Sequence, residues 1–223
     1  MKNYGIKKVL VLVIALVAIL VLFLVVMGDV VNSGFITRLD GQVAQFLYAN
    51  RDPSLIALFT TITVLGTWQV ATLITIIIPL LLWFRRKRLY LLPFLGTVVG
   101  SALFNLISKM VIQRPRPALS FYIESSFSFP SGHASIAIAL YGFIIYVLFQ
   151  EVRRPWVKAG IILAGLALIL LIGLSRLYFG VHYVSDVLGG YLSGTLFLIP
   201  GIALVEWFRG KQYFFSSAKI GKL

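Results

Sequence analysis

The chain has 223 residues, of which 60% are hydrophobic and 12% charged, and it contains no cysteine. This composition excludes an ordinary soluble domain, and the lack of cysteine excludes disulfides, thiolate catalysis and cysteine-ligated metals. The net charge of +13 does not indicate nucleic-acid binding, because the basic residues cluster between apolar runs of membrane-spanning length. We therefore expect an all-α, polytopic membrane protein with a single domain over residues 1–223.

Six runs are long and apolar enough to cross a membrane as helices, since a span needs about 20 mostly apolar residues. They cover roughly residues 8–28, 67–84, 89–112, 132–150, 158–176 and 184–207. The first follows a basic start, as in a signal peptide, but its apolar run is too long and no small-residue cleavage pattern follows it. We expect it to remain as the first span of a six-helix bundle.

The segment between the first two spans, residues 29–66, is partly apolar without being a clear span. Apolar residues between Leu39 and Leu47 recur at helical spacing with polar residues among them. This pattern predicts a short amphipathic helix in the membrane interface. Residues 54–66 are apolar but too few to cross the membrane, so we expect an interfacial or re-entrant segment packed against the start of the second span.

Basic clusters at the ends of the predicted spans indicate the topology. Fourteen of the twenty lysines and arginines lie on one face, which the positive-inside rule makes cytoplasmic together with both termini and the tail from residue 212. They are Lys2, Lys7, Lys8, Arg85, Arg86, Lys87, Arg88, Arg153, Arg154, Lys158, Arg209, Lys211, Lys219 and Lys222. The outward face carries Arg38, Arg51, Lys109, Arg114, Arg116 and Arg176 with Glu124, His133, His182 and Asp186.

The only two histidines, His133 and His182, stand at outward ends of predicted spans, as do Lys109, Arg116 and Arg176. Singly, each cation can snorkel to the interface or meet lipid headgroups. In a compact bundle they converge, and because like charges repel they require an anionic partner. A phosphoryl group fits, since arginine binds its oxygens bidentately and lysine adds a point charge.

The residues around the two histidines suit phosphoryl chemistry. Ser131 and Gly132 lead into the fourth span, so backbone N–H groups at its start can bind the same anion. His182 and Asp186 are four residues apart and share one helix face if the sixth span begins there. A carboxylate bound to one ring nitrogen leaves the other free as a nucleophile. His133 can protonate a leaving oxygen and later deprotonate water.

A metal site is an alternative use of the same side chains. The two histidines with Asp186 and Glu124 are ligands that zinc accepts. Three nearby cations oppose a divalent ion unless the substrate accompanies it. We therefore expect no metal and no cofactor.

As spaced, these residues closely resemble the three-part signature of the type-2 phosphatidic acid phosphatase family of integral membrane lipid phosphatases. The signature reads Lys-x6-Arg-Pro, then Pro-Ser-Gly-His, then Ser-Arg-x5-His-x3-Asp. The matching residues are Lys109 and Arg116-Pro117, Pro130 to His133, and Ser175-Arg176 with His182 and Asp186, all within residues 109–186. Arg114-Pro115 offers a second register for the first part, and the six-residue gap from Lys109 selects Arg116.

The resemblance implies six membrane helices and metal-independent hydrolysis of a lipid phosphate or pyrophosphate at the outer membrane face. His182 would form a phosphohistidine, Asp186 would hold its tautomer, and His133 would protonate the leaving group and then activate water. The phosphoryl oxygens would be bound by Lys109, Arg116, Arg176, Ser131 and Gly132.

The resemblance leaves the substrate and the acceptor open. Small bacterial members are most similar to phosphatases of undecaprenyl pyrophosphate or phosphatidylglycerophosphate, and phosphatidic acid is a further candidate. We expect a bacterial plasma membrane protein whose partners are the bilayer and a lipid phosphate, with no nucleic acid and an undetermined oligomeric state. The alternatives are a lipid phosphotransferase of the same family and a non-catalytic carrier of lipid phosphates or anions.

Overall fold

The computed structural model describes residues 2–220, and side chains from residue 9 to residue 210. In that part of the chain all regular structure is helical. The elements are α1 (Lys2–Val31), α2 (Phe35–Ala49), α3 (Pro53–Val64), α4 (Trp68–Phe84), the 3-10 turn η1 (Arg88–Tyr90), α5 (Leu91–Ile112), α6 (Gly132–Ile136), the π-helical turn η2 (Ala137–Tyr141), α7 (Gly142–Glu151), α8 (Pro155–Tyr178) and α9 (Val184–Ile220).

Six segments of the described chain are long and apolar enough to cross a membrane, which confirms the predicted all-α, six-span architecture. They are Val9–Val31, Pro53–Phe84, Arg88–Ile112, Gly132–Glu151, Pro155–Tyr178 and Val184–Gly210. The second differs from the expected span of 67–84, because it also includes α3, which the sequence analysis placed outside the spans. The fourth span joins α6, η2 and α7 without a break. The predicted tail from residue 212 continues α9 as far as Ile220, and residues 221–223 lie outside the described part.

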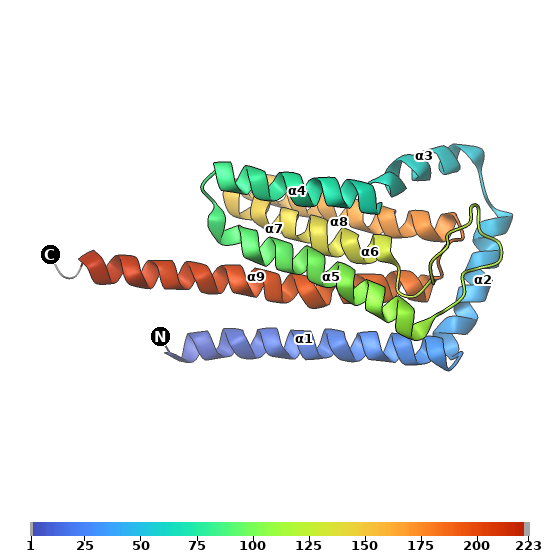
Figure 1. The fold of residues 1–223 in the computed structure, drawn as a ribbon, viewed down its shortest axis with the longest axis horizontal. Helices are drawn as coiled ribbons and strands as arrows, with labels where there is room; N and C mark the ends of the chain where they lie inside the picture. Colours follow the sequence, from blue (N-terminus) through green and yellow to red (C-terminus); the bar gives the residue numbers. More distant parts are fainter. Residues whose placement is uncertain (1, 221–223) are drawn as a thin grey trace.

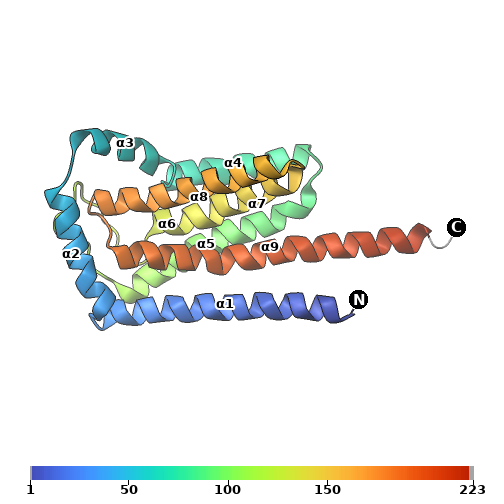
Figure 2. The ribbon, with the colours of Figure 1, turned by 180° about the vertical axis from the view of Figure 1, so that it is seen from behind.

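The spans lie side by side and alternate in direction, while α2 crosses one end of the bundle (Figure 1). The start of α1 and the far end of α9 lie at the opposite end, as do the connections from α4 to α5 and from α7 to α8. The reverse view in Figure 2 agrees. The segment between α5 and α6 and the start of α9 therefore meet near α2. Six of the lysines that were used to predict the topology have side chains outside the described part of the chain. They are Lys2, Lys7, Lys8, Lys211, Lys219 and Lys222.

The segment between α1 and α4 forms two helices, and the amphipathic one is α2. Asp29 at the end of α1 fixes the corner, because its carboxylate accepts hydrogen bonds from the backbone N–H groups of Ile36 at 3.1 Å and Thr37 at 2.9 Å. The buried side chain of α2 is Asp40. A carboxylate is thus the residue that α2 presents to the protein interior.

The second helix of this segment, α3, packs differently from the sequence expectation. It lies along α8 rather than against the start of α4. Phe59 of α3 contacts Tyr178 and Phe179 at the end of α8, with the rings of Phe59 and Tyr178 at 4.8 Å. The expectation was wrong because the aromatic residues that complement α3 belong to the fifth span, which no periodicity within 54–66 reveals.

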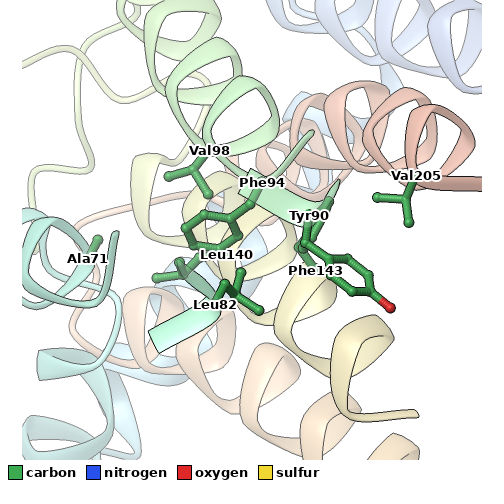
Figure 3. Close-up of a cluster of buried hydrophobic side chains, with 8 residues drawn as sticks. All are labelled: Ala71, Leu82, Tyr90, Phe94, Val98, Leu140, Phe143 and Val205. Atoms are coloured by element: carbon green, nitrogen blue, oxygen red, sulfur yellow. The ribbon is translucent and has the colours of Figure 1, made fainter. Parts of the chain in front are cut away.

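A cluster of eight buried apolar side chains (Figure 3) joins α4, α5, η2, α7 and α9 and reaches the connection from α4 to α5 at Tyr90. Phe94 of α5 and Phe143 of α7 are fully buried there and meet edge to face with ring centroids 5.5 Å apart. Val205 of α9 belongs to the same cluster. In a bilayer such contacts stabilise the bundle through close packing, because lipid tails are as apolar as the side chains. The predicted site residues Arg176 and His182 are also buried, but they lie at the end of α8 and before the start of α9, near α2.

Candidate active site

The predicted site residues come from four elements whose ends lie near α2. Lys109 is in the last turn of α5, Arg116 is in the segment that connects α5 to α6, Ser131 to His133 begin α6, Arg176 is in the last turn of α8, and His182 and Asp186 flank the start of α9. Antiparallel spans bring these ends together although they are far apart in sequence (Figure 1).

Close packing of α6 on α9 positions the Pro-Ser-Gly-His segment. A Cβ atom on Gly190 would lie 2.5 Å from the Ser131 carbonyl oxygen, and one on Gly194 would lie equally close to that of Ser135. With glycine at both positions, the Ser131 backbone N–H donates to the Asp186 carbonyl at 2.9 Å. This bond joins the second part of the signature to the third. Small residues of this kind let helix backbones approach closely within membranes.

His182 and Asp186 meet, but not on one helix face as expected, because α9 begins at Val184 and His182 precedes it. The Nδ1 atom of His182 lies 3.3 Å from Oδ2 of Asp186, which also accepts the Tyr183 backbone N–H at 2.9 Å. The Nε2 atom faces Nη1 of Arg116 at 3.2 Å. A guanidinium has only donors, so Nε2 acts as the acceptor and the ring proton sits on Nδ1, towards Asp186.

The surroundings of His182 favour its neutral form. Burial lowers the pKa of His182 to about 4, and Arg116 and Arg176 add to this lowering while Asp186 opposes it. Charging a buried imidazole beside guanidinium groups is unfavourable. At neutral pH the Nε2 atom is therefore unprotonated, and its lone pair is directed towards Arg116, one of the predicted phosphate-binding cations.

Glu124 lies between Arg116 and Arg176 and pairs with both. Its Oε2 atom is 2.6 Å from Nη2 of Arg116, and its Oε1 atom accepts from Nη2 of Arg176. Burial raises the pKa of Glu124, but the two guanidiniums outweigh it, so the net pKa is lowered and the group is a carboxylate. Arg116 is further fixed by the carbonyl oxygens of Ser126 and Val181, each at 2.7 Å. Sequence reasoning placed Glu124 on this face but missed that it is the counterion of both arginines.

The other two cations are held by neighbouring segments. Arg176 is buried and its Nη1 donates to Oγ1 of Thr63 at 2.8 Å and to the hydroxyl of Tyr122 at 2.5 Å. Lys109 donates to the backbone carbonyls of Phe127 and Ser128. Arg116 and Arg176 therefore converge on one carboxylate, whereas the hydrogen bonds of Lys109 go to the segment before α6.

Three buried polar atoms have no hydrogen-bond partner among the described residues. They are Oγ of Ser131, Nε2 of His133 and Nε of Arg176. Buried polar groups are nearly always paired, and leaving one unpaired costs about 1–3 kcal/mol. All three atoms belong to predicted site residues, so the unsatisfied groups coincide with the place where an oxygen-rich ligand is expected.

A second layer of charged residues behind Asp186 was not foreseen. Nη1 of Arg114 lies 2.5 Å from Oδ1 of Asp186 and 2.7 Å from Oγ of Ser185. Nη2 of the same guanidinium lies 2.8 Å from Oδ2 of Asp40 on α2, and Oδ1 of Asp40 accepts the Ser185 backbone N–H at 3.0 Å. These four side chains form a buried ionic network.

One signal in the sequence could have identified Asp40. Its position falls on the apolar face of α2, at helical spacing from Ile36, Val43 and Leu47. A carboxylate on an apolar face needs a buried cation. The partner could not be identified without the fold, because Arg114 is 74 residues away and was read as an alternative register of the signature.

The alternative metal site lacks a suitable ligand cluster. Among residues whose side chains are described, no three His, Asp or Glu side chains gather as a metal-binding group. His182 and Asp186 adjoin each other, but Arg114 and Arg116 occupy the positions beside them. The groups next to these two side chains are therefore guanidiniums, which carry hydrogen-bond donors and no metal-binding lone pair.

Comparisons with known proteins show the family to which the chain belongs. The PAP2 superfamily matches residues 90–210. Phosphatidylglycerophosphatase B of Bacillus subtilis is 35% identical over 203 residues, covering 86% of this chain and 97% of that protein. The undecaprenyl-diphosphatase of Sulfolobus acidocaldarius is 27% identical, covering 79% of this chain and 82% of that protein.

A solved structure has the same fold. The crystal structure of a transmembrane PAP2 type phosphatidylglycerolphosphate phosphatase from Bacillus subtilis superposes with a TM-score of 0.77 at 32% sequence identity. The match covers 88% of this chain and 96% of that one. With six apolar helices and relatives named as phosphatases along most of its length, the chain belongs to the PAP2 superfamily and is a multi-pass membrane phosphatase.

Proposed function

We propose that this enzyme hydrolyses a lipid phosphate or pyrophosphate through a phosphohistidine on His182, without a metal ion, in one domain. The observation that carries the proposal is the setting of His182. Its Nδ1 faces the carboxylate of Asp186, and its Nε2 faces the arginine cluster where a phosphoryl group would bind. A neutral imidazole held in this way is an activated nucleophile.

Binding of the phosphoryl group would use the cations and the unpartnered atoms of the site. Its oxygens would replace the Glu124 carboxylate on Arg116 and Arg176. Oγ of Ser131 and Nε of Arg176 would gain the partners that they lack. The backbone at Gly132 and the Lys109 ammonium would complete the set. Donors fixed before the reaction stabilise the charge that grows on the equatorial oxygens.

Two displacements would complete the reaction. The Nε2 lone pair of His182 forms the N–P bond as the bond from phosphorus to the leaving oxygen breaks. That oxygen takes a proton from the imidazolium form of His133, which the negative charge of the bound phosphoryl group stabilises. A water molecule then gives a proton to His133 and attacks phosphorus, the N–P bond breaks, and inorganic phosphate leaves. Nε2 of His133, buried and unpartnered in the described chain, is free for this exchange.

For the substrate we propose phosphatidylglycerophosphate first, because the relative with that activity in its name aligns over 97% of its length. Undecaprenyl pyrophosphate is the second candidate, from the name of the Sulfolobus relative, and phosphatidic acid is the third. We also propose that both termini face the cytoplasm and the site faces outward in a bacterial plasma membrane, because the basic clusters lie opposite the site.

The test is phosphate release by detergent-purified enzyme from these three lipids with EDTA present, comparing wild type with His182→Ala. We expect release by wild type and loss of about 10⁴-fold or more in the variant, as for removal of other nucleophiles. Loss of wild-type activity in EDTA, or an active His182→Ala enzyme, would refute the mechanism. If the lipid phosphate is consumed only when a lipid or sugar acceptor is added, and the phosphoryl group then appears on that acceptor rather than as free phosphate, the enzyme is instead a phosphotransferase.

A further inference from the structure

The ionic network behind Asp186 has no part in the mechanism above. We propose that Arg114 and Asp40 are positioning residues that hold the Asp186 carboxylate for His182, so that the interfacial helix α2 belongs to the catalytic machinery. The proposal rests on the proposed role of His182 as the nucleophile.

Each oxygen of Asp186 has its own partners. Oδ2 lies against Nδ1 of His182 and the Tyr183 backbone N–H, while Oδ1 lies 2.5 Å from Nη1 of Arg114. The Arg114 side chain lies over the ring of Tyr183, with its Cζ 4.2 Å from the ring centroid. Arg114 thereby fixes the rotation of the carboxylate, and that rotation sets the tautomer and the aim of the imidazole.

Asp40 in turn fixes Arg114 and alters the charge balance. Two carboxylates, Asp40 and Asp186, share one guanidinium, so the network carries one negative charge beside His182. When Nε2 bonds to phosphorus, the imidazole ring becomes cationic, and this negative charge stabilises it. Without Asp40, Arg114 would neutralise Asp186 and weaken its hydrogen bond to His182.

A purely structural role explains the network poorly. Asp40 is 1% exposed, Asp186 is fully buried and Arg114 is 8% exposed, so both ion pairs are formed at the cost of desolvating charges. Apolar residues of similar volume often stabilise a protein as well as such pairs or better. Moreover, α2 is held in place elsewhere, by Asp29 at its start and by Leu47 packed near Phe59.

The first arm of the test is a double-mutant cycle with Asp40→Asn, Arg114→Gln and the double variant, measured as kcat and KM for the best lipid substrate. We expect each single variant to lower kcat about 10-fold to 100-fold, as losses of outer partners of catalytic groups do, with KM within about twofold. Because Asp40 acts through Arg114, Asp40→Asn should have almost no further effect in the Arg114→Gln background.

The matched control is Asp29→Asn, which loosens the start of α2 without touching the network. We expect it to lower the melting temperature and to leave kcat within about twofold of wild type, because Asp29 shares no partner with the network and should not be energetically coupled to it. A wild-type kcat for Asp40→Asn, or independent multiplication of the two single effects, would overturn the positioning role. An equal loss of kcat in Asp29→Asn would overturn it as well.

The second arm does not depend on activity or on recovery of Arg114→Gln. With only two histidines in the chain, ¹⁵N-histidine NMR with His133→Ala for assignment reports His182 directly. We expect the Nδ1–H tautomer in wild type and an upfield shift of that proton in Asp40→Asn, as its hydrogen bond weakens. An unchanged His182 signal in folded Asp40→Asn would overturn the proposal. Inactive wild type with the expected shift would refute the proposed hydrolysis and leave the positioning of His182 supported.

Discussion

The environment of His182 differs from that of an ordinary, solvent-exposed histidine. Its two ring nitrogens face groups of opposite charge, the carboxylate of Asp186 and the guanidinium of Arg116. Two features set its chemistry: burial keeps the ring neutral, and the carboxylate selects the tautomer. The presence of this pair could be predicted from the spacing of residues 182 and 186. The geometry could not, because the helix start at Val184 depends on packing.

The first prediction concerns the protonation of His182. Burial, aided by Arg116 and Arg176, lowers its pKa to about 4, so the ring should take up a proton only near pH 4 and stay neutral above it. In the His133→Ala variant a single histidine remains, and its ¹⁵N shifts can be followed from pH 8 to pH 3.5. A midpoint near the ordinary value of about 6.5 would contradict the buried, arginine-flanked setting.

The second prediction concerns Glu124. Its carboxylate neutralises Arg116 and Arg176, so a phosphoryl group must compete with it. Glu124→Gln should lower KM and the inhibition constant of inorganic phosphate by about fivefold, the equivalent of roughly 1 kcal/mol for a partly exposed pair.

The control for Glu124 is Glu206→Gln, which removes the negative charge from the carboxylate that accepts from the Tyr146 hydroxyl, at the opposite end of the bundle. It should leave both constants unchanged. A raised KM in Glu124→Gln would mean that the carboxylate helps to bind the substrate rather than competing with it.

Among the elements, the contact between α6 and α9 and the position of α2 determine the site. The spans themselves follow from hydropathy and agree with the structure to within a few residues at most ends. Hydropathy does not show which face of a span contacts another helix, because apolar residues that face lipid have the same hydropathy as apolar residues that face protein. The packing of α3 on α8 and the burial of Asp40 against Arg114 were therefore missed.

The third prediction tests the contact between α6 and α9. Gly190→Val places a branched side chain against the Ser131 carbonyl and should displace the Pro-Ser-Gly-His segment. We expect kcat to fall at least about tenfold and the melting temperature to drop, since overpacking costs about 1–3 kcal/mol. Gly160→Val on α8 is the matched control, because a Cβ there meets no atom within 4 Å. Equal effects of the two substitutions would show that valine in a helix, and not the contact, is responsible.

At the scale of the whole molecule, the chain is polarised along the bundle. The start of α1, the far end of α9 and two basic connections lie at one end, and the candidate site lies at the other (Figures 1 and 2). The charge distribution predicted this separation, because clusters at span ends and isolated cations near the histidines can be distinguished in the sequence. The fold adds the helix α2, which crosses the bundle at the end that carries the candidate site and contacts α8 and α9 there.

The fourth prediction is the orientation in the membrane. The chain has no cysteine, so single cysteines can be placed at will. Ala118→Cys, in the exposed segment beside the site, should react with a membrane-impermeant maleimide in intact cells, whereas Arg86→Cys at the opposite end should react only after lysis. The reverse pattern would place the site on the cytoplasmic side and contradict the positive-inside assignment.

The proposed hydrolysis depends most on a covalent intermediate at His182. The direct measurement is rapid quenching of wild-type enzyme during turnover under neutral or basic conditions, followed by mass spectrometry of its peptides. We expect a phosphoryl group on the peptide that contains His182 in the wild-type enzyme and none in His182→Ala. Turnover with no phosphorylated peptide, or with the phosphoryl group on another residue, would contradict it.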